Sequence, residues 1–202
     1  MEKKIIAIYG SPRRDGNTSS LMDSFLDGVK ENLYAGDINI DRIMVSSKKI
    51  APCRGCRSCT KTGECIIDDY MQKIYPKLID ADFIVLATPI FFTTVSGYLK
   101  ALIDRCQRLW SLKYEHKKKI VAKTRPGILM ACAGSSNPKI FDCARMVTRS
   151  FFDVLYVDYH SDYVFNGVDE KGDIQKVPGA LENLFNFGKS KQFAQLLKAG
   201  EK

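Results

Sequence analysis

The sequence predicts an α/β fold in which helices cover both faces of a doubly wound, five-stranded parallel sheet. Short apolar runs alternate along the chain with segments whose apolar residues recur at helical spacing. Two of the runs, 83–87 and 127–132, are continuously apolar, as is typical of strands buried on both faces. Parallel strands joined through helices have right-handed crossovers, which place helices on both faces of the sheet.

Five apolar runs are expected to form the strands: 5–9, 38–45, 83–87, 127–132 and 154–165. Asp41 and Arg42 interrupt the second run, which favours a place at the edge of the sheet. His160, Ser161 and Asp162 predict a break in the last run.

Helical spacing is found in the intervening segments 21–33, 71–78, 95–110, 137–151 and 178–197. Asp68 or Asp69 can cap the second helix. Pro76 is expected to kink this helix or to lie near a break, because proline removes a helical hydrogen bond. Pro138 suits the first position of the fourth helix.

The composition is that of one globular domain, residues 1–202, with 45% hydrophobic and 27% charged residues. No apolar run approaches the roughly 20 residues of a membrane helix. The first ten residues lack the length and cleavage pattern of a signal peptide. A cytoplasmic location away from membranes is therefore expected.

The formal net charge of +8 raises the question of nucleic-acid binding. Eight Lys or Arg lie in the basic tract 105–125, which has neither an interleaved aromatic ladder nor helix-turn-helix spacing. Such a run is most often a solvated face, so no nucleic-acid partner is predicted. A docking patch for an acidic redox protein, or for a nicotinamide phosphate, is a better functional interpretation.

The loop 10–20, between the first strand and the first helix, is a candidate phosphate site. Its glycines, Gly10 and Gly16, permit positive φ, and Ser11, Asn17, Thr18, Ser19 and Ser20 supply short polar side chains. Unpaired N–H groups at the helix start add the positive end of the helix dipole. An ordinary turn, with Asn17 or Thr18 as the helix cap, is the alternative.

The spacing within this loop narrows the kind of phosphate. A Walker A loop requires a Lys directly after its second glycine, where this chain has Asn17. A dinucleotide site requires G-x-G-x-x-G, whereas Gly10 and Gly16 are farther apart. A terminal monophosphate suits the hydroxyl-rich loop better.

The segment GSPRRDGNTSS resembles the phosphate loop of the flavodoxin-like NAD(P)H-dependent FMN reductases, and TPIFF followed by LKALIDR resembles a second segment of that family. The resemblance implies strand order 2-1-3-4-5, bound FMN, NAD(P)H as a possible donor, and a homodimer or homotetramer. It implies that FMN contacts Ser11, Arg13, Asn17, Thr18, Ser19, Pro89, Ile90, Phe91, Phe92, Ala133 and Gly134. Phe91 stands where Tyr is common in the family, and one of Phe91 and Phe92 is expected to pack in the core.

A cysteine-rich loop, 48–67, is inserted after the second strand. Cys53, Cys56, Cys59 and Cys65 have the spacing C-x2-C-x2-C-x5-C, which allows four thiolates to hold one cubane cluster. The spacing and the following CIIDDYM resemble the compact motif of the iron-sulfur flavoproteins, which implies a [4Fe-4S] cluster. A structural zinc, or a metal-free redox disulfide, remains an alternative. The other cysteines, Cys106, Cys132 and Cys143, are not expected to bind metal.

The predicted function is that of an FMN-dependent oxidoreductase and electron-transfer iron-sulfur flavoprotein, which passes electrons between a donor, NAD(P)H or ferredoxin, the flavin and the cluster. Because the flavin carries the chemistry, no catalytic side chain is predicted, and His116 and His160 are expected to be surface or packing residues. One alternative is an FMN, quinone or nitro-compound reductase without a working cluster. The other is a non-enzymatic thiol-rich metal-binding or redox-sensing module whose basic tract contacts an acidic partner.

Overall fold

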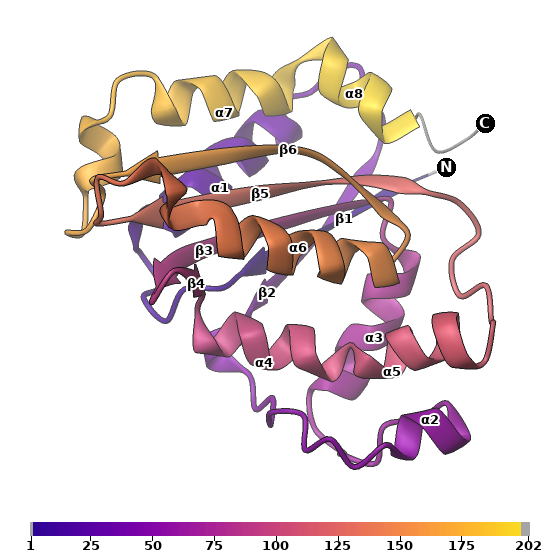
Figure 1. The fold of residues 1–202 in the computed structure, drawn as a ribbon. Helices are drawn as coiled ribbons and strands as arrows, with labels where there is room; N and C mark the ends of the chain where they lie inside the picture. The colour runs from indigo at the N-terminus through magenta and orange to yellow at the C-terminus, as the bar shows by residue number, and fades with distance from the viewer. Residues whose placement is uncertain (1, 199–202) are drawn as a thin grey trace.

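A computed structural model describes residues 2–198 and shows a parallel sheet between two layers of helices (Figure 1). Its parallel strands are β1 (Lys3–Tyr9), β2 (Ile38–Met44), β3 (Phe83–Phe91), β5 (Arg125–Ala133) and β6 (Val157–Asn166). They lie in the order β2-β1-β3-β5-β6, with β2 at an edge. The predicted order, 2-1-3-4-5, differs in numbering because β4 (Thr94–Val95), a two-residue strand antiparallel to β3, was not predicted.

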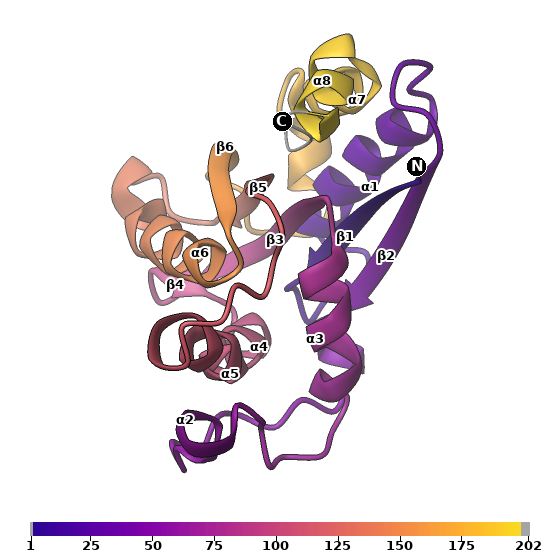
Figure 2. The same cartoon turned by 90° about the vertical axis from the view of Figure 1, so that its right-hand side faces the viewer.

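The helices cover the two faces of the sheet (Figure 2). One face carries α1 (Asn17–Lys30), α7 (Ala180–Lys189) and α8 (Lys191–Lys198), and the other carries α3 (Met71–Asp80), α4 (Gly97–Arg105), α5 (Gln107–Trp110) and α6 (Asp142–Val154). The short α2 (Ser58–Thr62) lies in the cysteine-rich loop, away from the sheet. Four short helical turns complete the chain: Val45–Ser47, Ser111–Glu115, Pro138–Phe141 and Asp173–Lys176.

The two cores follow from the alternation of side chains along each strand. In β1, Ile5 and Ala7 face α1 and α7, whereas Ile6 and Ile8 face α3 and α4. All four side chains are buried, which explains why this strand is apolar from Ile5 to Ile8.

Several predicted boundaries were wrong. The first helix ends at Lys30, so Leu33 lies beyond it and is 92% exposed. The predicted helix 178–197 is two helices, because Ser190 is extended and its hydroxyl accepts the N–H of Phe193 at 3.1 Å, within the first turn of α8. The predicted helix 95–110 is likewise divided between α4 and α5.

The predicted break at 160–162 is a β-bulge. Strand β6 continues through it, with Gly127 opposite Tyr159 and the next residue, Ile128, opposite Ser161. His160 is therefore the extra residue, and the pairing resumes after it. Pro76 lies inside α3, which runs through it without ending.

The basic tract 105–125 is not solvated at its two ends. Arg105 and Arg125 are only 1% and 2% exposed. Arg125 donates to the main-chain oxygens of Leu78, Ile79 and Ala81 at the end of α3, and to that of Leu155 after α6. Because the guanidinium satisfies carbonyl groups at two helix ends, Arg125 has a structural role.

None of the helices in the part of the chain that the structure describes is long and apolar enough to cross a membrane.

Candidate functional site

The carboxyl edge of the sheet holds the first candidate site. The loops after β1, β3, β5 and β6 line one cavity there, with Ser11, Arg13, Gly16, Asn17, Thr18, Pro89, Ile90, Phe91, Cys132, Ala133, Gly134, Val168 and Asp169. Its enclosed volume is about 60 Å³. This volume is well below the ~300–1,000 Å³ typical of whole small-molecule sites, so the enclosed part suits a small group such as a phosphate.

The start of α1 at this cavity has the properties of an anion site. Its N-cap is Gly16, and no side chain accepts a hydrogen bond from the N–H groups of its first turn. The hydroxyl of Ser19, which does not itself line the cavity, is buried and has no hydrogen-bond partner among residues 2–198. Unpaired donors at a helix start, together with a buried hydroxyl, fit the phosphate of FMN.

The two glycines of the phosphate loop serve a different purpose from the predicted one. Neither has a positive φ, and Gly16 is extended. Gly10 is required by close packing, because a Cβ at this position would lie 2.9 Å from the main-chain oxygen of Ala87 and 3.0 Å from the side chain of Leu99. The first loop can therefore approach β3 and α4 only with glycine at its start.

Ser96, which sequence reasoning missed, joins the first two loops. Its buried hydroxyl donates to the main-chain oxygen of Gly10 and accepts the N–H of Leu99 at 3.2 Å, which caps α4. Its own N–H donates to the hydroxyl of Thr88 at 3.1 Å. A serine before a helix suggests a cap, but its second partner lies 86 positions away and is visible only in the fold.

Asn17 and Arg13 contact protein groups around the cavity. The Asn17 amide donates to the main-chain oxygen of Glu170 at 2.9 Å and accepts the N–H of Gly172 at 3.0 Å. Arg13 Nη1 donates to the main-chain oxygen of Asp169 at 3.3 Å. These side chains hold the loop after β6 against the phosphate loop, so Asn17 positions the wall of the site.

The tip of the β3–β4 hairpin presents two aromatic side chains. Phe91 lines the cavity and is 47% exposed, whereas Phe92 is fully exposed and does not line it. The expectation that one of them packs in the core was therefore wrong. Phe92 and Thr93 both have positive φ, which is strained for a β-branched residue such as Thr93.

The cysteine-rich loop forms the second candidate site. Cys53, Cys56, Cys59 and Cys65 line one cavity of about 330 Å³, together with Ile67, Arg105, Arg108, Trp110 and others. Cys53 and Cys56 are exposed, and Cys59 and Cys65 are partly buried. Burial raises the pKa of Cys59, and the neighbouring Cys65 and Cys53 raise it further.

Four thiols around a common cavity are a donor set that fits a four-thiolate cluster. The thiols are not drawn together into a closed ligand group. Within residues 2–198, no three or more His, Cys, Asp or Glu side chains are gathered closely enough to hold a metal ion as they stand. The structure thus brings the predicted ligands to one cavity without closing the site.

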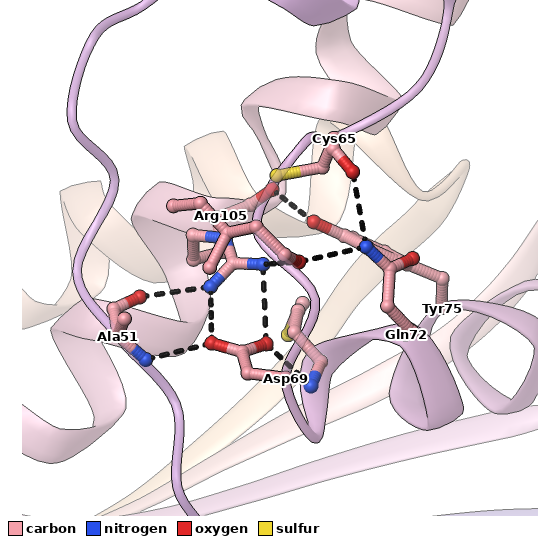
Figure 3. Close-up of polar contacts among 8 residues, drawn as sticks. Ala51, Cys65, Asp69, Gln72, Tyr75 and Arg105 are labelled. Atoms are coloured by element: carbon pink, nitrogen blue, oxygen red, sulfur yellow. Dashed lines mark hydrogen bonds and ion pairs between the residues drawn. The ribbon is translucent and has the colours of Figure 1, made fainter.

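A buried ion pair lies beside this cavity (Figure 3). Arg105 Nη1 is 2.6 Å from Asp69 Oδ2, and Nη2 is 3.2 Å from Oδ1. Gln72 donates to the main-chain oxygens of Cys65 and Ile67 at 3.1 and 2.8 Å. These contacts attach the end of the cysteine-rich loop to α3 and α4.

The sequence matches the NADPH-dependent FMN reductase family over residues 3–147. The chain belongs to this family. The predicted recognition is therefore confirmed, and the predicted cofactor and class of flavin-dependent oxidoreductase agree with the family.

Among curated relatives, an iron-sulfur flavoprotein of Methanosarcina thermophila is 33% identical over 134 residues, which cover 66% of this chain and 65% of that protein. Iron-sulfur flavoprotein MJ1083 of Methanocaldococcus jannaschii is 39% identical over 106 residues, which cover 52% and 53%. The chain thus spans about half to two thirds of the length of these relatives.

Solved structures share the fold. An NAD(P)H:quinone oxidoreductase from Methanothermobacter marburgensis superposes with a TM-score of 0.67 at 13% identity, covering 94% of this chain and 96% of that one. An FMN-dependent NADH-azoreductase from Bacillus anthracis, solved with FMN, gives 0.66 at 12% identity, covering 95% and 99%. At these identities the likeness shows the flavodoxin-like fold alone.

Proposed function

We propose that this protein is an FMN-dependent oxidoreductase that takes electrons from NAD(P)H or ferredoxin and exchanges them with a [4Fe-4S] cluster held by Cys53, Cys56, Cys59 and Cys65. The observation that carries the flavin part is the uncapped start of α1, which opens into a cavity lined by the loops after β3 and β5. Family membership and a ligand site beyond the carboxyl ends of the strands support the same cofactor.

Different residues around the cavity would contact the phosphate and the ring of FMN. The first turn of α1, with Thr18 and Ser19, would bind the phosphate through N–H and hydroxyl groups. Pro89, Ile90 and Phe91 on one side, with Ala133 and Gly134 on the other, would flank the ring. When bound, FMN supplies hydride acceptance from NAD(P)H and one-electron transfer. Phe91 offers no phenol, so its contribution is apolar shielding.

The cluster part rests on four thiols that line one cavity, and on relatives named iron-sulfur flavoproteins. Arg54, Arg57, Arg105 and Arg108 also line the cavity, as does Glu115. Arg105 and Arg108 are paired with Asp69 and Glu64, so the walls add positive charge chiefly through Arg54 and Arg57. Cationic side chains favour thiolates over thiols and offset the negative charge that four thiolates bring together.

A second candidate is an FMN, quinone or nitro-compound reductase without a cluster. The observation in its favour is that Cys53 and Cys56 are exposed and that the thiols form no closed ligand group among the described residues. Both functions use the same flavin site, so only the metal content separates them.

We also infer that the protein forms a homodimer or homotetramer. Within one chain the cysteine cavity and the flavin cavity share no lining residue, and α2 lies apart from the β3–β4 hairpin (Figure 1). The start of the cysteine-rich loop is closer to the hairpin, because Lys48, Lys49, Ile50 and Pro52 line a pocket with Phe91. Exposed Phe91, Phe92 and Trp110 offer apolar surface for association. Association between copies would bring the cysteine site of one chain near the flavin site of another. An acidic redox protein such as ferredoxin is the proposed partner for the cationic rim of the cysteine site.

Anaerobic titration with NADPH, followed by visible spectroscopy, tests this function. We expect copurified FMN whose absorbance bleaches on addition of NADPH or reduced ferredoxin, and a broad iron-sulfur absorbance beneath it. Cys56→Ser should remove the broad absorbance and leave FMN bound. Cys143→Ser is the matched control, because this exposed cysteine lies outside the motif. Protein without flavin, or iron retained in full by Cys56→Ser, contradicts the proposal.

A further inference from the structure

Arg105 is a buried charge in the wall of the cysteine cavity. It is 1% exposed and lines the cavity together with the four cysteines. A buried cation is retained only where the contacts that it makes compensate for lost hydration.

Four of the five N–H donors of this guanidinium make hydrogen bonds, two to main-chain oxygens at the two ends of the cysteine-rich loop and two to the carboxylate of Asp69. Nη1 donates to the main-chain oxygen of Ala51 at 2.9 Å, just before Cys53. Nη2 donates to that of Ile67 at 3.1 Å, just after Cys65. Each nitrogen also bonds one oxygen of Asp69 (Figure 3). Asp69 in turn accepts the N–H of Ala51 at 2.8 Å, so the pair closes the loop from both sides.

The fifth donor has no partner in the described part of the protein. Nε of Arg105 is buried and makes no hydrogen bond within residues 2–198. Cys65 and Arg105 line the same cavity, and Figure 3 draws both residues in one cluster of contacts. An N–H group and a positive charge beside the sulfur atoms stabilise negative charge on them.

We propose that Arg105 is a positioning residue of the cysteine site, which fixes the spacing of the loop ends and directs Nε–H and positive charge toward the sulfur atoms of the group that the four cysteines bind. The role in the metal site rests on the proposed cluster. The role in closing the loop holds for the metal-free protein as well.

Three variants test this proposal. Arg105→Met removes the charge and all five donors. Arg105→Lys keeps the charge but cannot bridge Ala51, Ile67 and Asp69 together. Arg125→Met is the matched control, because Arg125 is about equally buried and also makes four hydrogen bonds, all to main-chain oxygens, yet does not line the cysteine cavity.

The first readout is amide hydrogen exchange of residues 51–69 in metal-free protein. We expect faster exchange in Arg105→Met and Arg105→Lys than in wild type, with residues 51–69 unchanged in Arg125→Met. Equal exchange in wild type and both Arg105 variants overturns the role in closing the loop.

The second readout is iron affinity and the midpoint potential of the anaerobically reconstituted protein. Both Arg105 variants should lose about 10-fold or more in iron affinity, as is typical when a group that orients metal ligands is removed. The potential should fall in Arg105→Met and fall less in Arg105→Lys, because only the lysine keeps a charge that stabilises the reduced cluster. Unchanged affinity and potential in iron-loaded Arg105→Met overturn the proposal, whereas wild type that binds no iron overturns the cluster itself.

Discussion

Thr18 and Ser19 lie in the first turn of α1, where a hydroxyl can act directly on a bound phosphate. Thr18 lines the cavity, and the hydroxyl of Ser19 is buried without a partner. Each charge-assisted contact to phosphate contributes about 1.5–3 kcal/mol. We therefore expect Thr18→Ala with Ser19→Ala to raise the Kd for FMN at least about tenfold. Flavin fluorescence titration measures this Kd, and an unchanged value in the double variant would contradict the assignment of the phosphate site.

Asp69 makes the closure of the cysteine-rich loop dependent on pH. Burial raises the pKa of this carboxyl, but hydrogen bonds from Arg105 and from the N–H groups of Ala51 and Met71 outweigh burial and lower the pKa below its ordinary value of 3.8. A depressed pKa in the folded state gives stability that is complete above pH 3.8 and is lost as the pH falls through the folded-state value.

Urea unfolding of metal-free protein at roughly pH 5 and pH 3 measures this dependence. Wild type should lose more free energy of unfolding between the two pH values than Asp69→Asn, which has no carboxylate to protonate. Equal losses in the two proteins contradict the role of Asp69.

At the scale of single residues, the sequence predicted candidate ligands from local patterns but not the contacts around them. The four cysteines line one cavity, and of the phosphate-loop hydroxyls Ser11 and Thr18 line the other. The pairing of Asp69 with Arg105 joins positions 36 apart, and no local pattern distinguishes Arg105 from its exposed basic neighbours. For the same reason the contacts of the Asn17 amide with the loop after β6 were not predicted, and its role as an FMN ligand stays a prediction.

At the scale of elements, the packing of α1 against α7 depends on close approach of their main chains. A Cβ at Gly28 would lie 2.0 Å from the main-chain oxygen of Phe185, which no flexible side chain can relieve. Gly28→Ala should therefore lower the free energy of unfolding by about 1–3 kcal/mol, since the helices must separate. Chemical denaturation measures it, with an exposed site such as Ser150→Ala on α6 as the control. Wild-type stability in Gly28→Ala would contradict this close packing.

Strands were predicted more reliably than helix ends. The apolar runs of β1, β3 and β5 identify buried strands because no other element of that length is apolar throughout. The bulge at His160 and the short β4 are defined by pairing with a neighbouring strand, and periodicity in one segment carries no information about that pairing. The division at Ser190 depends instead on a local cap, in which the Ser190 hydroxyl accepts the N–H of Phe193.

At the scale of the whole molecule, the separation of the two candidate sites predicts association between copies. A homodimer or homotetramer should appear by light scattering of the FMN-loaded protein, and Phe92→Ser should shift it toward monomer, because Phe92 is fully exposed at the tip of its hairpin. Met146→Ser on α6 is the control, since Met146 is also exposed but lies on another element. Monomer alone at high concentration with FMN bound rules out the assembly.

The central claim is that one chain carries both a flavin and an iron-sulfur cluster. Its most direct test is analysis of iron, acid-labile sulfide, zinc and FMN in protein isolated without oxygen. We predict about four iron and about four sulfide for each FMN, because four cysteines supply one outer ligand to each iron of a cubane. FMN accompanied by zinc, or by no metal, would contradict the account and leave the cluster-free FMN reductase in its place.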